Sequence, residues 1–292
     1  MELKLTYVED DATKNKRKVE KVLITIILTV ITALCLLPGL MLLINATRAN
    51  TQLQSGFSLL PGASFFKNLY GAFHDSSIDI GKGLLNSFII AIATSVLTCY
   101  FSTMCAYGIY VYDFAGKKVL YGLIIAFMLI PTQVSAVGYV QLVNMVGLKD
   151  SFIPLILPGV ASPVAFFYMI QYMRQAVDKE IIEAARVDGS NEFRTFNRII
   201  IPIMRPAIAV QGIFAFVSSW NNYFIPSLLI NEKDKKTIPM MMATLRSTAN
   251  SLDYDLGKLY MFVLISILPV IVVYLILSKS IIGGITAGAV KQ

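Results

Sequence analysis

The sequence has few charged residues for its length. Only 15% of its 292 residues are charged, whereas 56% are hydrophobic, and soluble domains are typically about 25% charged. This deficit indicates an integral membrane protein rather than a soluble one. The net charge of +7 does not indicate nucleic-acid binding, because no basic face with interleaved aromatic residues occurs in the chain.

The sequence also has only three cysteines and one histidine. Cys35, Cys99 and Cys105 all lie in apolar runs, where a thiol behaves as a small apolar group. Their odd number and the lack of a CxxC pair argue against a disulfide framework or a zinc site. His74 has no second histidine or cysteine near it. We therefore expect no metal site.

Motifs for catalysis and for energy conversion are missing as well. The chain has no GxxxxGK[ST] phosphate-binding loop, no HExxH motif and no Ser/His/Asp arrangement. No Asp or Glu lies in the core of an apolar run, whereas ion-coupled carriers usually place ionisable groups within the membrane. These absences predict a protein that is not an enzyme and binds no cofactor itself. If it drives uphill transport, a partner must supply the energy.

Long apolar runs are abundant. A helix that crosses the bilayer core needs about 20 mostly apolar residues, and six runs satisfy this requirement, which predicts an all-α integral membrane protein with six transmembrane helices. The first run lacks a small-residue cleavage site and is too long for a signal peptide, so we expect it to remain as an anchor. The predicted spans are Val22–Asn45, Gly83–Tyr112, Val119–Val137, Phe152–Tyr172, Ala207–Ile230 and Leu259–Ile281.

The positive charges predict the orientation of these spans. With a cytoplasmic N-terminus, 16 of the 25 Lys and Arg residues fall on the inner side, as the positive-inside rule requires. Both termini are then cytoplasmic. The resulting division is an N-terminal tail (1–21), a six-span domain (22–281) whose inner loop covers about 173–206, and a C-terminal tail (282–292).

Prolines interrupt the third and fourth predicted spans. Proline removes a backbone hydrogen bond and permits a kink in a membrane helix. We expect either hinges or passive kinks at these positions, which are Pro131, Pro154, Pro158 and Pro163.

The loop at 173–206 has signals for two short helices. Asp178 can cap the first helix, and Gly189 is well placed to end it in a left-handed conformation. Three-and-four spacing places Ile181, Ala184 and Ala185 on one flat face that another protein could approach. Ser190 is predicted to cap the second helix. An ordinary hairpin between two spans is the alternative.

A spaced motif in this loop resembles a known signature. Glu183-Ala184-Ala185, three residues, Gly189, nine residues and then Ile199-x-Ile201-Pro202 resemble the EAA signature of ABC importer permeases, in which leucine is usual at the position of Ile201. The C-terminal residues 283–291 resemble the tail of MalG-like permeases of maltose-type carbohydrate importers. The chain is therefore identified as a member of this family, with the type I ABC importer permease fold.

The resemblance implies several partners in a prokaryotic plasma membrane. Family members pair with a second, related permease, with two cytoplasmic ATPase subunits that carry ATP and Mg, and with an extracytoplasmic sugar-binding protein. The EAA loop forms the coupling helix that docks on an ATPase, and the tail around Gly288–Gln292 also reaches the ATPases. In this chain the coupling residues are expected to be Glu183, Ala184, Ala185, Arg186, Asp188 and Gly189.

Polar residues near the middle of the fifth predicted span indicate a substrate pathway. Gln211, Ser218 and Asn222 are spaced seven and four apart, which predicts one shared helix face, and amides can bond sugar hydroxyls. The alternative is that such residues hold helices together. The expected pathway residues for an oligosaccharide are Ser218, Trp220, Asn221, Asn222, Tyr223 and Gln133.

Other functions stay open at this point. The same importer class could carry glycerol phosphate or polyols. A membrane scaffold that transports nothing is a further alternative, although the polar residues within a span argue against it. An integral membrane enzyme is disfavoured by the missing catalytic groups.

Overall fold

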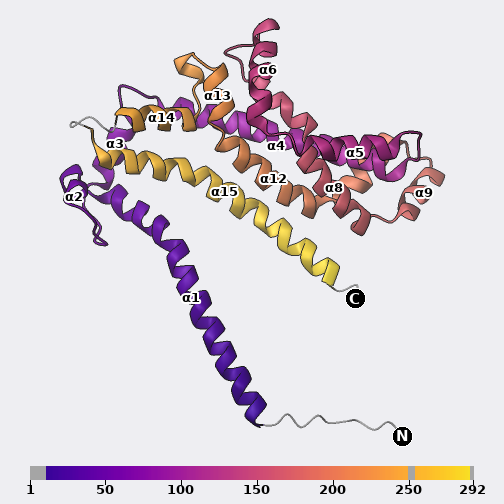
Figure 1. The fold of residues 1–292 in the computed structure, drawn as a ribbon, viewed down its shortest axis with the longest axis horizontal. Coiled ribbons are helices and arrows are strands. Elements are labelled where there is room, and N and C mark those ends of the chain that lie inside the picture. Colours follow the sequence, from indigo (N-terminus) through magenta and orange to yellow (C-terminus); the bar gives the residue numbers. More distant parts are fainter. Residues whose placement is uncertain (1–10, 249–253, 290–292) are drawn as a thin grey trace. The chain divides into compact units, whose positions relative to one another are not determined.

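The computed structural model describes residues 11–248 and 254–289 and divides into two compact units. One unit contains the chain up to Leu69 together with Asp255–Leu264, and the other contains Tyr70–Tyr254 and the chain from Ile265 onward. Within the described ranges the chain consists of helices and loops without a strand, which confirms the predicted all-α class (Figure 1).

The first unit is dominated by α1 (Asp11–Thr47). Its part from Glu20 to Thr47 is long and apolar enough to span a membrane. The Val, Leu and Ile side chains from Val22 to Leu40 are exposed, as a lipid-facing anchor requires. The end of α1 is fixed by Asn68, whose side-chain amide donates to the carbonyls of Ala46 and Arg48, at 2.9 Å each. Two short helices follow it, α2 (Asn50–Gln54) and α3 (Phe65–Phe73).

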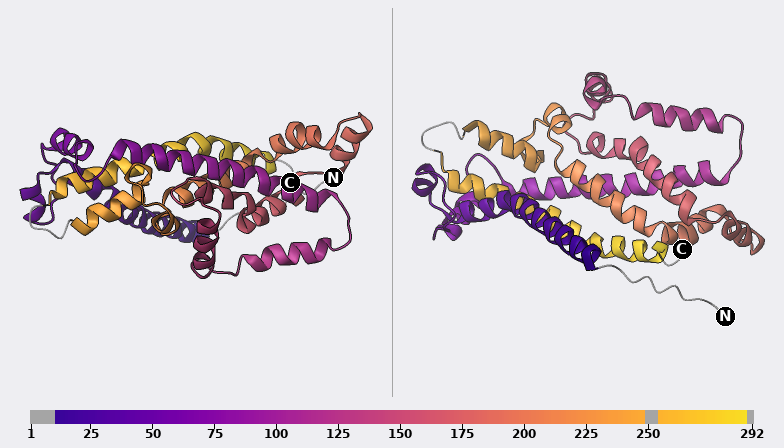
Figure 2. Two further views of the ribbon diagram at one scale, coloured as in Figure 1. Left: turned by 90° about the horizontal axis from the view of Figure 1, so that it is seen from above. Right: turned by 60° about the horizontal axis from the view of Figure 1, so that its bottom comes forward.

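The second unit is built along α4 (Ile80–Val111). Asp79 caps this helix by accepting from the backbone N–H of Lys82 at 3.0 Å. The helices α8 (Pro163–Ala176) and α12 (Arg205–Trp220) pack against α4 (Figures 1 and 2). Buried small residues along α4, among them Ala91 and Ala106 at 0% exposure, permit this close packing.

The third predicted span is broken. Helix α5 (Lys117–Phe127) and helix α6 (Thr132–Met145) meet at Pro131 with an angle of 97° between their axes. The prediction of one helix over Val119–Val137 was therefore wrong. Pro131 lacks an N–H and clashes with the preceding turn, so a helix ends before it.

The fourth predicted span consists of three helical segments. They are α7 (Ile153–Ile156), the 3₁₀ helix η1 (Leu157–Ala161) and α8. A proline occupies the first or second position of each segment. A backbone N–H at these positions makes no hydrogen bond within the helix, so its absence in proline costs nothing there. These prolines therefore start new segments instead of kinking one continuous helix.

The fifth predicted span, Ala207–Ile230, is also wrong as a single helix. Helix α12 ends at Trp220, and a separate helix α13 (Phe224–Leu229) follows. A continuous helix would place Pro226 in its interior, where it would remove a backbone hydrogen bond and clash with the carbonyl of Asn222. At its other end, α12 meets the segment Glu192–Ile203 at 80°.

Four helices in the described residues are long and apolar enough to cross a membrane, and the number rises to six if each bent pair forms one span. The last of these four spans, Leu256–Ser278, is part of α15 (Leu256–Ala289). The residues of α15 are divided between the two units at Leu264. Helix α15 therefore extends beyond the predicted span Leu259–Ile281 and into the predicted tail, of which residues 290–292 lie outside the described part. The remaining elements are α9 (Lys179–Val187), α10 (Glu192–Thr195), the π-helical turn η2 (Phe196–Ile200), α11 (Ile201–Ile203), η3 (Lys233–Lys235) and α14 (Ile238–Thr248).

Candidate functional site

The loop between α8 and α12 contains the first predicted short helix, α9. Asp178 takes its N-cap position, but its side chain makes no capping hydrogen bond within the described residues. The helix ends at Val187 with Asp188 as its C-cap, and the next residue, Gly189, has φ of +78°. The N–H of Gly189 donates to the Arg186 carbonyl at 3.0 Å, and that of Ser190 donates to the Ala185 carbonyl at 2.9 Å. These bonds satisfy the last carbonyls of α9, so the predicted helix end at Gly189 is confirmed.

The second short helix begins one residue later than predicted. Asn191, and not Ser190, is its N-cap, since the Asn191 side-chain oxygen accepts from the backbone N–H of Arg194 at 2.8 Å. The backbone N–H of Ser190 already closes α9, so this residue still belongs to the preceding helix end. The Ser190 hydroxyl instead accepts from the Thr195 hydroxyl at 2.9 Å.

Helix α9 has one face in the core and one face exposed. Ile182 and Ala185 are buried, with 1% and 7% exposure. Ile181, Ala184 and Val187 are exposed. Of the expected coupling residues, Ala185 therefore packs inward, and the other five are exposed: Glu183, Ala184, Arg186, Asp188 and Gly189.

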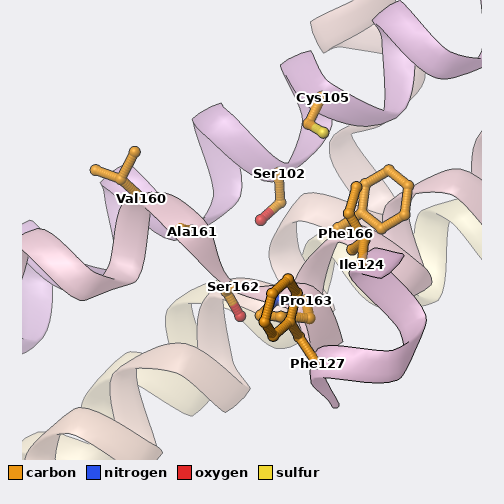
Figure 3. Close-up of a pocket in the computed structure, with 9 residues that line it drawn as sticks. All are labelled: Ser102, Cys105, Ile124, Phe127, Val160, Ala161, Ser162, Pro163 and Phe166. Carbon is orange, nitrogen blue, oxygen red and sulfur yellow. The ribbon is translucent and has the colours of Figure 1, made fainter. Parts of the chain in front are cut away.

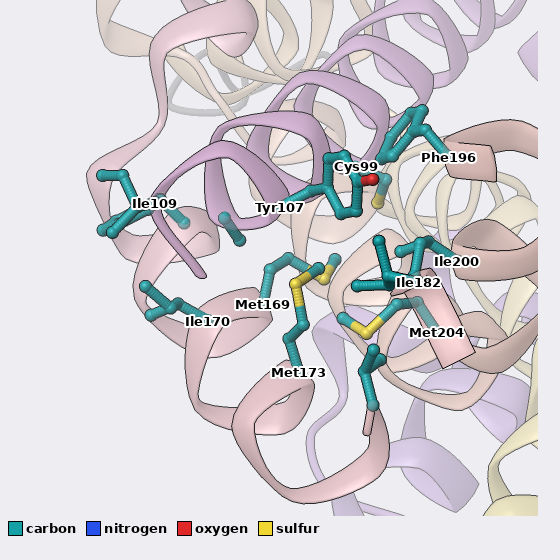
Figure 4. Close-up of a cluster of buried hydrophobic side chains, with 13 residues drawn as sticks. Cys99, Tyr107, Ile109, Met169, Ile170, Met173, Ile182, Phe196, Ile200 and Met204 are labelled. Atoms are coloured by element: carbon teal, nitrogen blue, oxygen red, sulfur yellow. The ribbon is translucent and has the colours of Figure 1, made fainter. Parts of the chain in front are cut away.

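Beneath α9 lies a cluster of buried hydrophobic side chains (Figure 4). Ile182 from α9 and Phe196 and Ile200 from η2 contribute to this cluster together with Tyr107 from α4 and Met173 from α8. Burial of such side chains is worth about 1.5–3 kcal/mol each. The loop is therefore packed firmly onto the ends of α4 and α8.

Tyrosines near the end of α4 also bind the loop through hydrogen bonds, and we call this group the tyrosine clamp. Each hydroxyl donates to a different point of the loop. The three bonds join Tyr100 to the Asn197 side-chain oxygen (3.3 Å), Tyr107 to Glu192 Oε2 (2.6 Å) and Tyr110 to the Val177 carbonyl (2.7 Å).

Glu192 connects the tyrosine clamp to α9. Its Oε1 accepts from Nε of Arg186 at 2.8 Å, while its Oε2 accepts from Tyr107. The hydrogen bond that Arg186 donates to Glu192 raises the pKa of Arg186, against the smaller opposing effect of burial. The Arg186 guanidinium lies over the Tyr112 ring at 5.5 Å. Sequence reasoning missed Glu192 and the clamp, although the run of tyrosines at the end of the second span was a visible signal.

The other end of α4 binds the segment before α14. The side-chain amide of Asn86 donates to the carbonyls of Asp234 and Lys236, at 2.8 and 3.0 Å, and Lys82 pairs with Asp234 at 2.7 Å. From Asn86 to Tyr107 the helix rises about 31 Å, which matches the roughly 30 Å bilayer core. The two bound segments are therefore separated along α4 by about the thickness of a bilayer core.

Asp150 joins the loop before α7 to the segment after α13. Its carboxylate accepts from the backbone N–H groups of Glu232, at 2.9 Å, and of Asn231. Its own N–H donates to the Leu229 carbonyl at 3.0 Å, and Lys235 Nζ donates to its carbonyl at 2.7 Å. The backbone N–H groups of Glu232 and Asn231 hold the pKa of Asp150 below its usual value.

We predict that this junction weakens only in acid. Because the folded-state pKa of Asp150 is lowered from 3.8, its stabilising effect is present above that value and is lost as the pH falls through the lower pKa. Limited proteolysis of the segment 231–237 should therefore be unchanged between pH 7 and 5. Asp150→Ala should increase cleavage at pH 7, also because Asp150 has φ of +57°, which alanine tolerates poorly. Equal cleavage of Asp150→Ala and wild type would contradict the assignment.

Three breaks in the helices meet at one cavity of about 290 Å³, which we call the broken-helix cavity. Its lining comes from α6, from the α7–η1 region, from the segment between α12 and α13, and from the start of α13. In membranes, irregular backbone is tolerated where it lines a cavity or is buried in protein. The polar or irregular positions in its wall are Thr132, Ser135, Tyr139, Pro158 and Asn222.

The expected pathway residues are not all at this cavity. Asn222 lines the cavity. Its sequence neighbours Asn221 and Tyr223 are exposed and do not line the cavity, and Gln133 is exposed on α6 and also lies outside the lining. Ser218 is in the last turn of α12 and also lies outside the lining.

Trp220 lies in the core rather than at the cavity. It is 3% exposed, its Nε1 donates to the Ser266 carbonyl at 3.1 Å, and its ring stacks on Phe216 at 5.6 Å. The prediction that Gln211, Ser218 and Asn222 share one helix face was wrong, because α12 ends at Trp220.

A larger cavity of about 490 Å³ lies among α4, α5, η1 and α8 (Figure 3). Its wall is mainly apolar, with Phe127 and Phe166 as its largest side chains. The hydroxyl of Ser102 is buried at this cavity, and no hydrogen-bond partner for it occurs in the described part of the chain. An apolar wall of this kind does not suit a hydrated sugar, so the broken-helix cavity is the better candidate for a polar substrate.

Comparison with known proteins agrees with this arrangement. Residues 100–282 match the family model described as "Binding-protein-dependent transport system inner membrane component". The arabinooligosaccharide transport permease AraQ of Bacillus subtilis is 33% identical over 94% of this chain and 96% of its own length. The diacetylchitobiose uptake permease NgcG of Streptomyces coelicolor is 29% identical over 88% of this chain and 84% of its own length.

A solved structure shows the same fold. The crystal structure of a bacterial ABC transporter involved in import of the acidic polysaccharide alginate matches with a TM-score of 0.77 and 21% identity, over 90% of this chain and 97% of the matched chain. The fold, the docked loop and the family match converge on one conclusion: this chain belongs to the family of inner membrane components of binding-protein-dependent transport systems, as a multi-pass permease subunit of an ABC importer.

Proposed function

We propose that this chain is the permease subunit of an ATP-driven importer for an oligosaccharide and forms one half of the translocation pathway. Relatives named for arabinooligosaccharide, diacetylchitobiose and lactose transport support this substrate class. The family and these relatives support residence in a prokaryotic plasma membrane, and the distribution of Lys and Arg supports cytoplasmic termini.

One structural observation carries the proposal. A continuous stretch of chain links the broken-helix cavity to the exposed coupling helix. Pro158 of η1 lines the cavity, α8 follows, and α9 begins after two further residues. A movement imposed on α9 by a partner is thereby transmitted to the wall of the cavity.

The partners follow from what the chain itself contains. A second, related permease would complete the pathway, and an extracytoplasmic binding protein would deliver the sugar. Two ATPase subunits, with ATP and Mg, would supply the energy, because the sequence has no phosphate-binding loop of its own. The exposed residues of α9 and its end, Glu183, Ala184, Arg186, Asp188 and Gly189, offer the docking surface, while buried Ala185 holds the helix in place.

Transport would proceed by alternating access. Closure of the ATPase pair moves the α9 helices of both permeases, and the packed ends of α4 and α8 follow because the tyrosine clamp and the buried cluster join them to the loop. The cavity then opens outward, receives the sugar and returns inward after hydrolysis. At the cavity, the Asn222 amide offers both a donor and an acceptor to sugar hydroxyls.

Uptake by the reconstituted importer tests the proposal. Proteoliposomes with both permeases, the ATPases and the binding protein should accumulate at least one labelled saccharide from a panel of arabinotriose, maltotriose, diacetylchitobiose and lactose. Asn222→Ala should lower that uptake about 3- to 10-fold, the effect of one or two lost hydrogen bonds. Asn144→Ala, which changes an exposed amide on α6 away from the cavity, is the matched control.

Two results would overturn the proposal. Accumulation of glycerol 3-phosphate but of no saccharide would assign a different cargo. Saccharide uptake that Asn222→Ala leaves unchanged would remove the broken-helix cavity from the pathway.

A further inference from the structure

A second polar cavity, of about 420 Å³, lies between α13 and α14, and we call it the α13–α14 pocket. Its volume is within the range typical of small-molecule sites. Unlike the cavity at Ser102, its wall is mostly polar. The polar side chains that line it are Tyr223, Ser227, Asn231, Lys236, Thr244 and Ser247.

The wall of this pocket is held in place by contacts outside it. The backbone N–H of Asn231 donates to Asp150, and the carbonyl of Lys236 accepts from Asn86 at 3.0 Å. Ile230 and Met240 form the floor and are 2% and 7% exposed. The pocket is therefore largely preformed, which lowers the entropy lost on binding.

The side chains provide both acceptors and donors. The hydroxyls of Ser227 and Ser247 donate to the carbonyls of Phe224 and Thr244, at 2.8 and 2.7 Å, so their oxygens remain available as acceptors. Lys236 and Asn231 add N–H donors. The half-exposed ring of Tyr223 offers an apolar face to the C–H side of a sugar.

Lys236 differs from the charged residues next to it in its lack of an ion-pair partner among the described residues. Lys235 pairs with Glu232 at 2.8 Å, and Asp234 is occupied by Lys82. Among the described residues, no carboxylate lies within ion-pair distance of Lys236. Its ammonium group can therefore donate to hydroxyl and ring oxygens of a ligand, and the mixture of donors, acceptors and one aromatic face matches a saccharide.

The pocket adjoins the proposed pathway. Helix α13 separates the two cavities, since Ile225 lines the broken-helix cavity and Ser227 lines the α13–α14 pocket. Asn222 and Tyr223, adjacent in sequence, likewise line one cavity each. We propose that the α13–α14 pocket is a saccharide-binding subsite that holds one sugar unit of an oligosaccharide beside the broken-helix cavity, an inference that rests on the proposed function.

Protection of an engineered thiol tests this subsite in the assembled importer. The Ser247→Cys subunit is labelled with a membrane-impermeant maleimide, and the parent importer gives the background from the native cysteines. The probe is the saccharide of the panel above that wild type transports fastest. We expect that saccharide to slow labelling at least threefold, whereas betaine at the same concentration should not.

A pair of lysine variants supplies the control. Lys236→Met should abolish the protection, while Lys233→Met should leave it intact, because Lys233 lies in the same segment but outside the pocket wall. Absent labelling, absent protection, protection by glycerol 3-phosphate alone, or equal protection in both lysine variants would each overturn the subsite. If the proposed function itself were wrong, wild type would transport no saccharide of the panel, and that result differs from each of the outcomes that overturn only the subsite.

Discussion

Gly189→Pro should reduce saccharide uptake at least tenfold while the assembled importer continues to hydrolyse ATP. Gly189 has φ of +78°, and its N–H donates to the Arg186 carbonyl at 3.0 Å. Proline requires φ near −65° and has no N–H, so α9 can no longer end at this point. The exposed residues of α9 would be displaced from the position in which we propose that they contact the ATPase. Uptake and ATP hydrolysis, measured in the same proteoliposomes, give the comparison.

A graded series of substitutions at Gly189 separates the effect of the left-handed backbone conformation from the effect of the added side chain. Asparagine tolerates the left-handed region, whereas alanine there costs roughly 1–2 kcal/mol. Uptake should therefore decline in the order Gly189, Asn, Ala, Pro. No neighbouring atom lies within 4 Å of the place that a Cβ would occupy at this position, so a steric clash does not explain the order. Normal transport by Gly189→Pro would show that this helix end is not part of the coupling.

Glu192→Ala should lower the number of sugars transported per ATP hydrolysed about tenfold. The substitution removes the hydrogen bonds from Tyr107 and Arg186 together. It also leaves the hydroxyl of Tyr107, a residue only 5% exposed, without its acceptor, at a cost of about 1–3 kcal/mol. Helix α9 would then move without moving α4. ATP hydrolysis would continue, but fewer hydrolysis cycles would open the cavity.

Three further variants make this result specific. Glu192→Gln keeps an acceptor for Tyr107 and should lose less. Tyr107→Phe combined with Glu192→Ala should be no worse than Glu192→Ala alone, as expected for two groups of one interaction. Glu180→Ala changes an exposed carboxylate in the first turn of α9 and should behave as wild type. A normal ratio of sugar to ATP in Glu192→Ala would refute transmission through the tyrosine clamp.

The parts of the loop at 173–206 that were predicted correctly depend on neighbours in the sequence. The position of Asp178 at the start of α9 and the left-handed Gly189 after its end follow rules that involve only a few consecutive residues, although the Asp178 side chain makes no capping hydrogen bond within the described residues. The one-residue error between Ser190 and Asn191 is of the same local kind. Both residues are good caps, and the choice depended on the bond by which Ser190 closes the preceding helix.

The missed parts depend on residues far apart in the chain. Glu192 and Tyr107 are 85 positions apart, and Asp150 and Glu232 are 82 positions apart. No periodicity or spacing connects such pairs. The broken spans were missed for a different reason, since hydropathy over about 20 residues does not register the hydrogen bond that Pro226 would remove.

By itself, the sequence determined that this is a helical membrane protein, where its apolar segments lie, and which loop carries the EAA-like motif. Composition, helix caps and short motifs act locally and are readable along the chain. The tertiary structure decided which face of α9 is buried, where the third and fifth spans break, and that Asn222 rather than Trp220 lines a cavity. These outcomes depend on packing and on hydrogen bonds between distant segments, which exist only once α4, α8 and α12 have come together.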